Sequence, residues 1–251
     1  MEYKLEICLD SAESAIIADK AGANRVELCE NLFGGGTTPS AGTIKITRQS
    51  VSLGLHVIIR PRPGDFCYTD TEFQVMMEDI RYCREVGVDG VVIGILKKDG
   101  TVDKERNASL IKEAGDMSIT FHRAFDVTVD PYQALEDIID LGCHRILTSG
   151  QEASVFEGAE LIRDIIQKAQ GRIIIMPGGD ITERKLPKII KETGAGEYHI
   201  YLDQECESVM QHCPDHVYMG GLLRKPEFRN SYTSTTRVDA VLSTLKPHSS
   251  L

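Results

Sequence analysis

The chain has 251 residues and a formal net charge of −10, and its length suits one large domain such as an α/β barrel. The acidic balance argues against nonspecific binding to nucleic acid or to an anionic membrane surface. No apolar run reaches the roughly 18 residues that a membrane span requires, and the first residues lack the pattern of a signal peptide, so we expect a cytoplasmic protein.

Short apolar runs rich in β-branched residues alternate with longer amphipathic segments, beginning with a predicted strand over residues 4–9 and a helix over 11–23. Seven more strands are predicted at about 25–29, 55–60, 90–95, 118–123, 144–148, 172–176 and 196–200. The later helices are predicted over 40–51, 70–87, 103–115, 130–142, 153–171 and 182–194, and most end in glycine, as helix C-termini commonly do. Eight βα units without a GxGxxG motif after the first strand favour a closed (β/α)8 TIM barrel over a Rossmann sheet.

The last part of the chain, from about residue 204 to 251, is more polar and ends in a predicted helix over 236–245. No linker rich in proline, glycine or serine divides the chain before it. We therefore expect a single domain, with the barrel over about 1–203 and a C-terminal extension that covers a barrel edge or a partner subunit.

Polar residues gather where the predicted strands end, which is where TIM barrels carry their chemistry. The runs "LEIC" and "VELC" each place a glutamate and a cysteine two residues apart, on one face of a strand. If the apolar residues between them face the helices, all four point into the barrel. The residues collected at the strand ends are Glu6, Cys8, Glu27, Cys29, His56, Arg60, His122, Arg123, Asp126, Ser149, Gly178, Gly179 and His199.

One interpretation of these residues is an enzyme that performs acid/base chemistry on a small anionic, for example phosphorylated, substrate. Glu27 and His122 would then be the acid/base candidates, and Arg60 with Arg123 would clamp the anion. The "PGGD" turn would bring the backbone of Gly178 and Gly179 close to a phosphate. Further residues expected to contact the substrate are Glu6, Asp126, Ser149 and His199.

A structural interpretation uses the same residues. The two glutamates could pair with Arg60 and Arg123 as an ion network inside the barrel, because a buried carboxylate requires a partner. The two cysteines could be small buried hydrophobic residues, and the histidines could be hydrogen-bonded core residues.

A third interpretation is a metal site. Cu(I) prefers soft thiolate ligands, and Cys8 and Cys29 could bind it together if their sulfurs lie within about 5 Å of each other. The seven cysteines lack CxxC spacing, which indicates free thiols in a reducing compartment rather than a disulfide framework or a structural zinc site.

Longer motifs follow one another along the chain: "LEIC" with Asp10, "ANRVELCENLFGGGTTPSAG" at 23–42, "IIRPRPGDFCYTDTEF" at 58–73, "GVVIGILKKDGTVD" at 90–103, "TFHRAFD" at 120–126, "RILTSGQ" at 145–151, "EYH" at 197–199 and "YMGG" at 218–221. Together they resemble the CutC family, named for copper homeostasis. The resemblance implies a (β/α)8 barrel, a cytoplasmic homo-oligomer (dimer or tetramer) and a copper role in which Cys8 and Cys29 are candidate Cu(I) ligands. The expected partner is thus a copper ion or a small anionic molecule; a structural or regulatory oligomer with a degenerate site is a further alternative.

Overall fold

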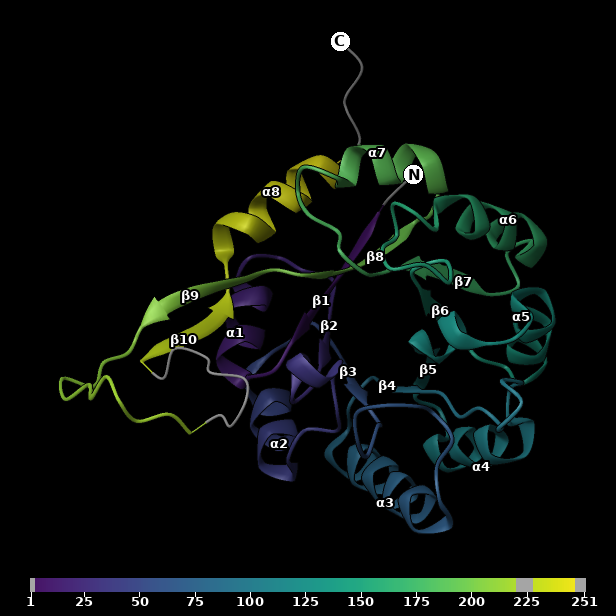
Figure 1. Cartoon of the computed structure of the whole chain (residues 1–251), viewed down its shortest axis with the longest axis horizontal. Helices are drawn as coiled ribbons and strands as arrows, with labels where there is room; N and C mark the ends of the chain where they lie inside the picture. The colour runs from purple at the N-terminus through teal and green to yellow at the C-terminus, as the bar shows by residue number, and fades with distance from the viewer. Residues whose placement is uncertain (1–2, 220–227, 247–251) are drawn as a thin grey trace.

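Eight parallel strands form a ring at the centre of the molecule, in the computed structural model that describes residues 3–219 and 228–246 (Figure 1). Neighbouring strands pair in the order β7-β6-β5-β4-β3-β2-β1-β8. A bridge between Gly178 and His199 brings β7 to β8 at the carboxyl ends of the strands. The predicted (β/α)8 TIM barrel is confirmed, with strands β1 (Lys4–Leu9), β2 (Arg25–Leu28), β3 (Gly54–Ile58), β4 (Gly90–Ile93), β5 (Ser118–Phe121), β6 (Arg145–Thr148), β7 (Ile174–Pro177) and β8 (Glu197–Tyr201).

Helices α1 to α7 each follow the strand of the same number and cover the outside of the ring (Figure 1). Local signals explain their ends. The helix α3, for example, begins with a capping box between Thr69 and Glu72 and ends at Gly87, whose φ of 77° suits glycine. The helices are α1 (Ala12–Lys20), α2 (Ala41–Ser50), α3 (Asp70–Val86), α4 (Lys104–Ala114), α5 (Pro131–Asp140), α6 (Ala159–Ala169) and α7 (Leu186–Thr193), with short 3-10 turns η1 (Leu32–Gly34) and η2 (Arg123–Val127).

Some predicted boundaries are wrong in a way that matters for the site. The strands predicted to reach residues 60 and 123 end at Ile58 and Phe121, so Arg60 and His122 belong to the loops that follow. His122 instead caps η2, because its ring accepts the N–H of Ala124. The helices predicted from 153 and from 182 begin later, at Ala159 and Leu186, after turns.

The segment after β8 supplies a hairpin and a further helix. Strands β9 (Asp203–Glu207) and β10 (Arg229–Thr233) pair antiparallel and project from the side of the barrel (Figure 1). The helix α8 (Thr235–Leu245) then packs against α7 and α1, with Val238, Val241 and Leu245 buried. It therefore completes the helical ring between the last and the first βα unit. Gly220 and Gly221 of the "YMGG" motif lie outside the described residues.

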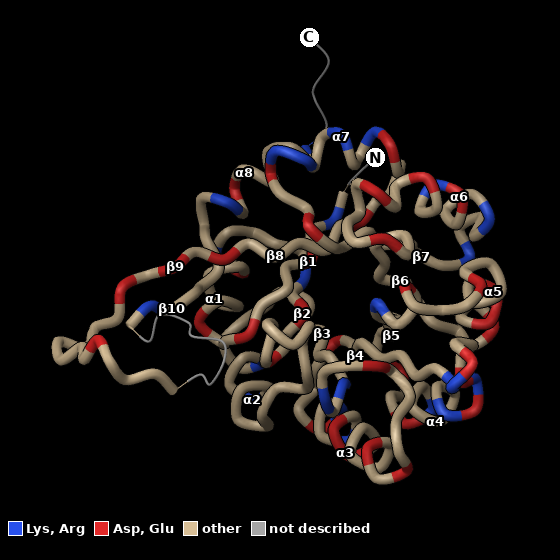
Figure 2. Tube along the Cα trace, viewed as in Figure 1, with Lys and Arg blue, Asp and Glu red and all other residues tan. Residues whose placement is uncertain are grey.

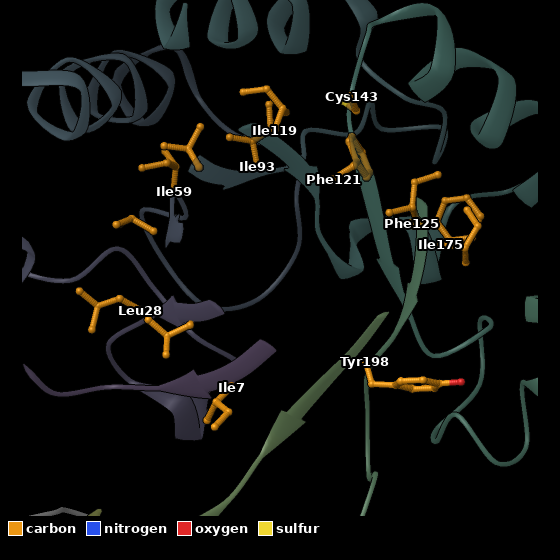
Figure 3. Close-up of a cluster of buried hydrophobic side chains, with 14 of the residues drawn as sticks. Ile7, Leu28, Ile59, Ile93, Ile119, Phe121, Phe125, Cys143, Ile175 and Tyr198 are labelled. Atoms are coloured by element: carbon orange, nitrogen blue, oxygen red, sulfur yellow. The ribbon is translucent and has the colours of Figure 1, made fainter. Parts of the chain in front are cut away.

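The apolar core lies between the strands and the helices, because alternate strand residues point outward. Outward-facing side chains such as Ile7, Leu28, Phe121 and Tyr198 belong to one buried cluster (Figure 3). Charged residues are concentrated on the outer helices and loops, but some lie on the inner strands (Figure 2). Among the described helices, none is both long enough and apolar enough to span a membrane.

Candidate functional site

A pocket of about 1160 Å³ opens at the carboxyl ends of the strands. Most of the residues predicted for the site line it: Cys8, Glu27, Cys29, Arg60, His122, Arg123, Asp126, Gly178, Gly179 and His199. Glu6 and Ser149 do not line it. Glu6 contacts the ring of His199, and Ser149 hydrogen-bonds to Asp126 and Arg123, so each adjoins a lining residue. His56 is buried and contacts Glu6.

Two thiols meet on the wall of this pocket. The sulfurs of Cys8 on β1 and Cys29, just after β2, are 3.9 Å apart. A carboxylate oxygen of Glu27 lies 3.4 Å from the Cys29 sulfur, and one donor atom from each of the three residues fits within a span of 4.8 Å. Cys29 also packs against Ile58 and Val92, so the thiol has the apolar surroundings of a core cysteine as well as a partner sulfur.

The pKa values of the two thiols are shifted in opposite directions. The hydrogen bond from Cys29 lowers the pKa of Cys8 to about 6 against the opposing effect of burial, and the imidazole of His199 contributes in the same direction. The same contact with Cys8, together with burial, raises the pKa of Cys29 well above its usual value. Cys8 is therefore the more acidic of the two thiols and the one that loses its proton first.

The carboxyl group of Glu27 is buried beside the two thiols. Burial raises its pKa to about 8; His199 opposes that shift, while Cys8 and Glu6 add to it. One carboxyl oxygen, Oε1, has no hydrogen-bond partner among the described residues. Glu27 is therefore mostly protonated at pH 7, which suits a proton donor and leaves one polar atom for a ligand.

A buried ion network lies deeper in the barrel. Arg25 donates to Glu6 through Nε and to Glu197 through Nη2, the latter at 2.7 Å. Glu197 also accepts from Arg145 at 2.8 Å, and Glu6 contacts His199 Nδ1 at 2.8 Å. The structural interpretation is thus correct that an ion network exists but wrong about its partners, because neither Arg60 nor Arg123 pairs with Glu6 or Glu27 among the described ion pairs.

Arg25 and Glu197, which were not among the residues predicted for the site, belong to the ion network beneath it. A signal was present, since Arg25 precedes Glu27 by two residues and Glu197 precedes His199 by two. Both therefore point into the barrel on the same strand faces. Through Glu6 they hold His199 next to the thiol pair.

Arg60 is buried in the wall of the pocket with 5% of its surface exposed. Its Nη1 donates to the carbonyls of Gly34 and Gly36, and its Nη2 donates to the carbonyl of Gly64, at 2.7 to 2.9 Å. Gly36 has a φ of 84°, which favours glycine there. Arg60 therefore joins the loops after β2 and β3, and the glycines of "LFGGG" allow their carbonyls to turn toward it.

His122 occupies a similar place on β5's side of the pocket. Its Nδ1 accepts the N–H of Ala124 at 3.1 Å, so the neutral ring carries its proton on Nε2. Burial, reinforced by the charge of Arg60, lowers the pKa of His122 to about 3. Space for the ring comes from Gly94, where a Cβ atom would lie 2.5 Å from it. This geometry suits a hydrogen-bond donor better than a group that exchanges protons near pH 7.

Arg123, Asp126 and Ser149 form one hydrogen-bonded group at the rim. Asp126 accepts from Arg123 Nε at 2.7 Å and from the N–H and hydroxyl of Ser149, and Arg123 Nη2 also donates to the Ser149 hydroxyl at 2.7 Å. The guanidinium lies against Gly179, whose φ is 133°. Arg123 thus already has a carboxylate partner, whereas no ion pair of Arg60 is present among the described residues.

Comparison with known proteins places the chain in a family. A model of the CutC family matches residues 3–203. The chain is 44% identical over 236 residues to the copper homeostasis protein cutC homolog of Mus musculus, covering 94% of this chain and 87% of the relative. It is 46% identical over 243 residues to a family protein CutC of Parabacteroides distasonis, covering 96% of this chain and all of the relative.

Solved structures extend the comparison. A CutC protein of Streptococcus agalactiae, named for copper homeostasis, superposes with a TM-score of 0.75 at 36% identity, covering 78% of this chain and 97% of that one. A thiamine phosphate pyrophosphorylase of Pyrococcus furiosus, at a TM-score of 0.59 and 14% identity over 97% of this chain and 95% of that one, shares the fold alone. The family resemblance carried by the sequence motifs is confirmed, and the chain belongs to the CutC family.

Proposed function

We propose that this protein takes part in copper homeostasis by binding one Cu(I) ion between Cys8 and Cys29. The observation that carries the proposal is the 3.9 Å separation of the two sulfurs at the wall of the pocket. Mammalian and bacterial relatives named for copper homeostasis support the physiological part of it.

The donor set fits the chemistry of Cu(I). Sulfurs 3.9 Å apart lie close enough for both to bind one ion, since the metal–sulfur distance in zinc thiolates is roughly 2.3 Å. Glu27 and His199 are polar neighbours of the thiols and would be the candidates for a third donor. Because Cys8 is already the more acidic thiol, copper would have to displace chiefly the proton of Cys29.

Anaerobic titration of Cu(I) against a competing chromophoric chelator tests this proposal. The wild-type protein is expected to bind one equivalent tightly. We expect Cys8→Ser and Cys29→Ser each to weaken binding by about 100-fold or more, exceeding the 10- to 100-fold effects typical of residues that only support a ligand.

The matched control removes thiols elsewhere. Cys206 and Cys213 are exposed and Cys67 is half-buried, so these are the cysteines at which copper would bind adventitiously. A variant with all three changed to serine should keep the tight equivalent. Tight binding that survives Cys8→Ser with Cys29→Ser, or that disappears in the triple-serine control, would contradict the assignment of the ligands.

Acid/base catalysis on a small anion stays a prediction. The unpartnered Oε1 and the raised pKa of Glu27 favour this residue as the proton donor of such a reaction. The contacts of His122 favour a hydrogen-bonding role for it instead.

A further inference from the structure

Arg60 carries a buried positive charge, and its hydrogen-bond partners in the described part of the chain are neutral. Its two terminal nitrogens donate to three backbone carbonyls, which satisfy hydrogen bonds but do not neutralise the charge. Its remaining donor, Nε, is inaccessible to solvent and has no hydrogen-bond partner among the described residues. A buried guanidinium is normally paired with an anion.

His122 presents a second unused donor. Since Nδ1 is committed to the N–H of Ala124, the hydrogen on Nε2 is the one that remains, and Nε2 is buried without a partner in the described structure. Leaving a buried donor unpaired costs free energy, so such a donor usually hydrogen-bonds to a ligand or a water molecule.

The two side chains meet on one aromatic ring. The guanidinium of Arg60 lies over Phe66 at 5.1 Å from the ring centre, and the imidazole of His122 lies 4.9 Å from the same ring. All three residues line the pocket, and only 3% of His122 and 5% of Arg60 is exposed. A cation and a neutral N–H donor are thus held side by side on a rigid apolar support.

We propose that Arg60 and His122 form a binding subsite for a small oxyanion, a carboxylate or a phosphate, in the same pocket as the thiol pair. The anion is the negatively charged partner of the Arg60 guanidinium and accepts a hydrogen bond from His122 Nε2. Phe66 forms the apolar side of the subsite. Anion binding at this subsite does not depend on copper binding, because neither thiol is needed to hold the anion.

The test is calorimetric titration of the metal-free protein, at constant ionic strength, with inorganic phosphate, acetate, pyruvate and malonate. At least one of these anions is expected to bind with a stoichiometry of one. Saturation by phosphate alone would identify a phosphorylated ligand, and saturation by the carboxylates alone would identify an organic acid; either result supports the subsite. The absence of saturable binding by all four would overturn it.

Two variants of one residue separate the binding role of His122 from its structural role. In His122→Asn the side-chain oxygen can still accept the N–H of Ala124, but the donor at Nε2 is lost; His122→Gln can place an N–H near the Nε2 position but loses the acceptor. We expect His122→Asn to weaken anion binding by about tenfold. His122→Gln should keep more of the anion affinity but lower the stability of the fold. An equal loss of affinity in both variants would contradict the proposal.

The charge is tested with a matched pair of arginines. Arg60→Gln is expected to abolish saturable anion binding, whereas Arg62→Gln, two residues away and bound to Asp65 and Glu72, should leave it unchanged. If Arg60→Gln fails to fold, the two His122 variants still decide the question. A parallel Cu(I) titration of His122→Asn should remain at one equivalent, so failure of the anion subsite is distinguishable from failure of the copper site.

Discussion

Arg25→Met is expected to destabilise the protein by about 3 to 5 kcal/mol, the usual result of removing one partner from a buried ion network. Arg25 is 6% exposed and bridges Glu6 and Glu197. Without it, the ion-pair partners that Glu6 keeps among the described residues are the histidines His199 and His56, and its buried negative charge is poorly compensated. Urea denaturation at pH 7 measures the loss.

An exposed arginine provides the control for this substitution. Arg172 makes two hydrogen bonds to Glu136, but both side chains are more than 40% exposed, so Arg172→Met should cost less than about 1 kcal/mol. Adding Glu6→Gln to Arg25→Met removes the uncompensated charge and should recover about 1 to 3 kcal/mol. Equal effects of Arg25→Met and Arg172→Met would mean that the buried network contributes little.

A second large effect is expected from the protonation of His122. The pKa of this residue is lowered from 6.5 to about 3, chiefly by burial and also by Arg60. As the pH falls below 6.5, His122 becomes protonated in the unfolded chain but stays neutral in the folded protein. Stability that is present above pH 6.5 is therefore lost. Between pH 7.5 and pH 5 this linkage amounts to about 2 kcal/mol.

The effect is read from a difference between proteins, since other groups titrate in the same range. His56, whose pKa burial lowers to about 4, acts in the same direction, and Glu27, whose pKa burial raises to about 8, acts in the opposite one. The stability advantage of wild type over His122→Asn should shrink by about 2 kcal/mol from pH 7.5 to pH 5. His144→Asn is the control, because it makes the same histidine-to-asparagine substitution at an exposed histidine that also accepts a backbone N–H. Parallel curves of stability against pH for wild type and His122→Asn would contradict the prediction.

Periodic features of the chain were enough to predict the barrel. The alternation of apolar runs with amphipathic segments, and glycines such as Gly87 and Gly194 at helix ends, located each βα unit. The two-residue spacing in "LEIC" and "VELC" was enough to orient Glu6, Cys8, Glu27 and Cys29 inward, because side chains alternate along a strand. Strand alternation and helix ends depend on residues close together in the chain, so they can be predicted from one sequence.

Pairing between inward-facing residues was decided only by the tertiary structure. The distance between Cys8 and Cys29 depends on the register of β1 against β2, in which Cys8 is opposite Glu27. The choice of Arg25 rather than Arg60 as the partner of Glu6 depends on depth in the barrel, since Arg25 is opposite Glu6 whereas Arg60 lies beyond the end of β3. Sequence by itself therefore determined the fold and which side chains face inward, while strand register and loop closure decided which thiols, carboxylates and cations meet, because those contacts join residues far apart in the chain.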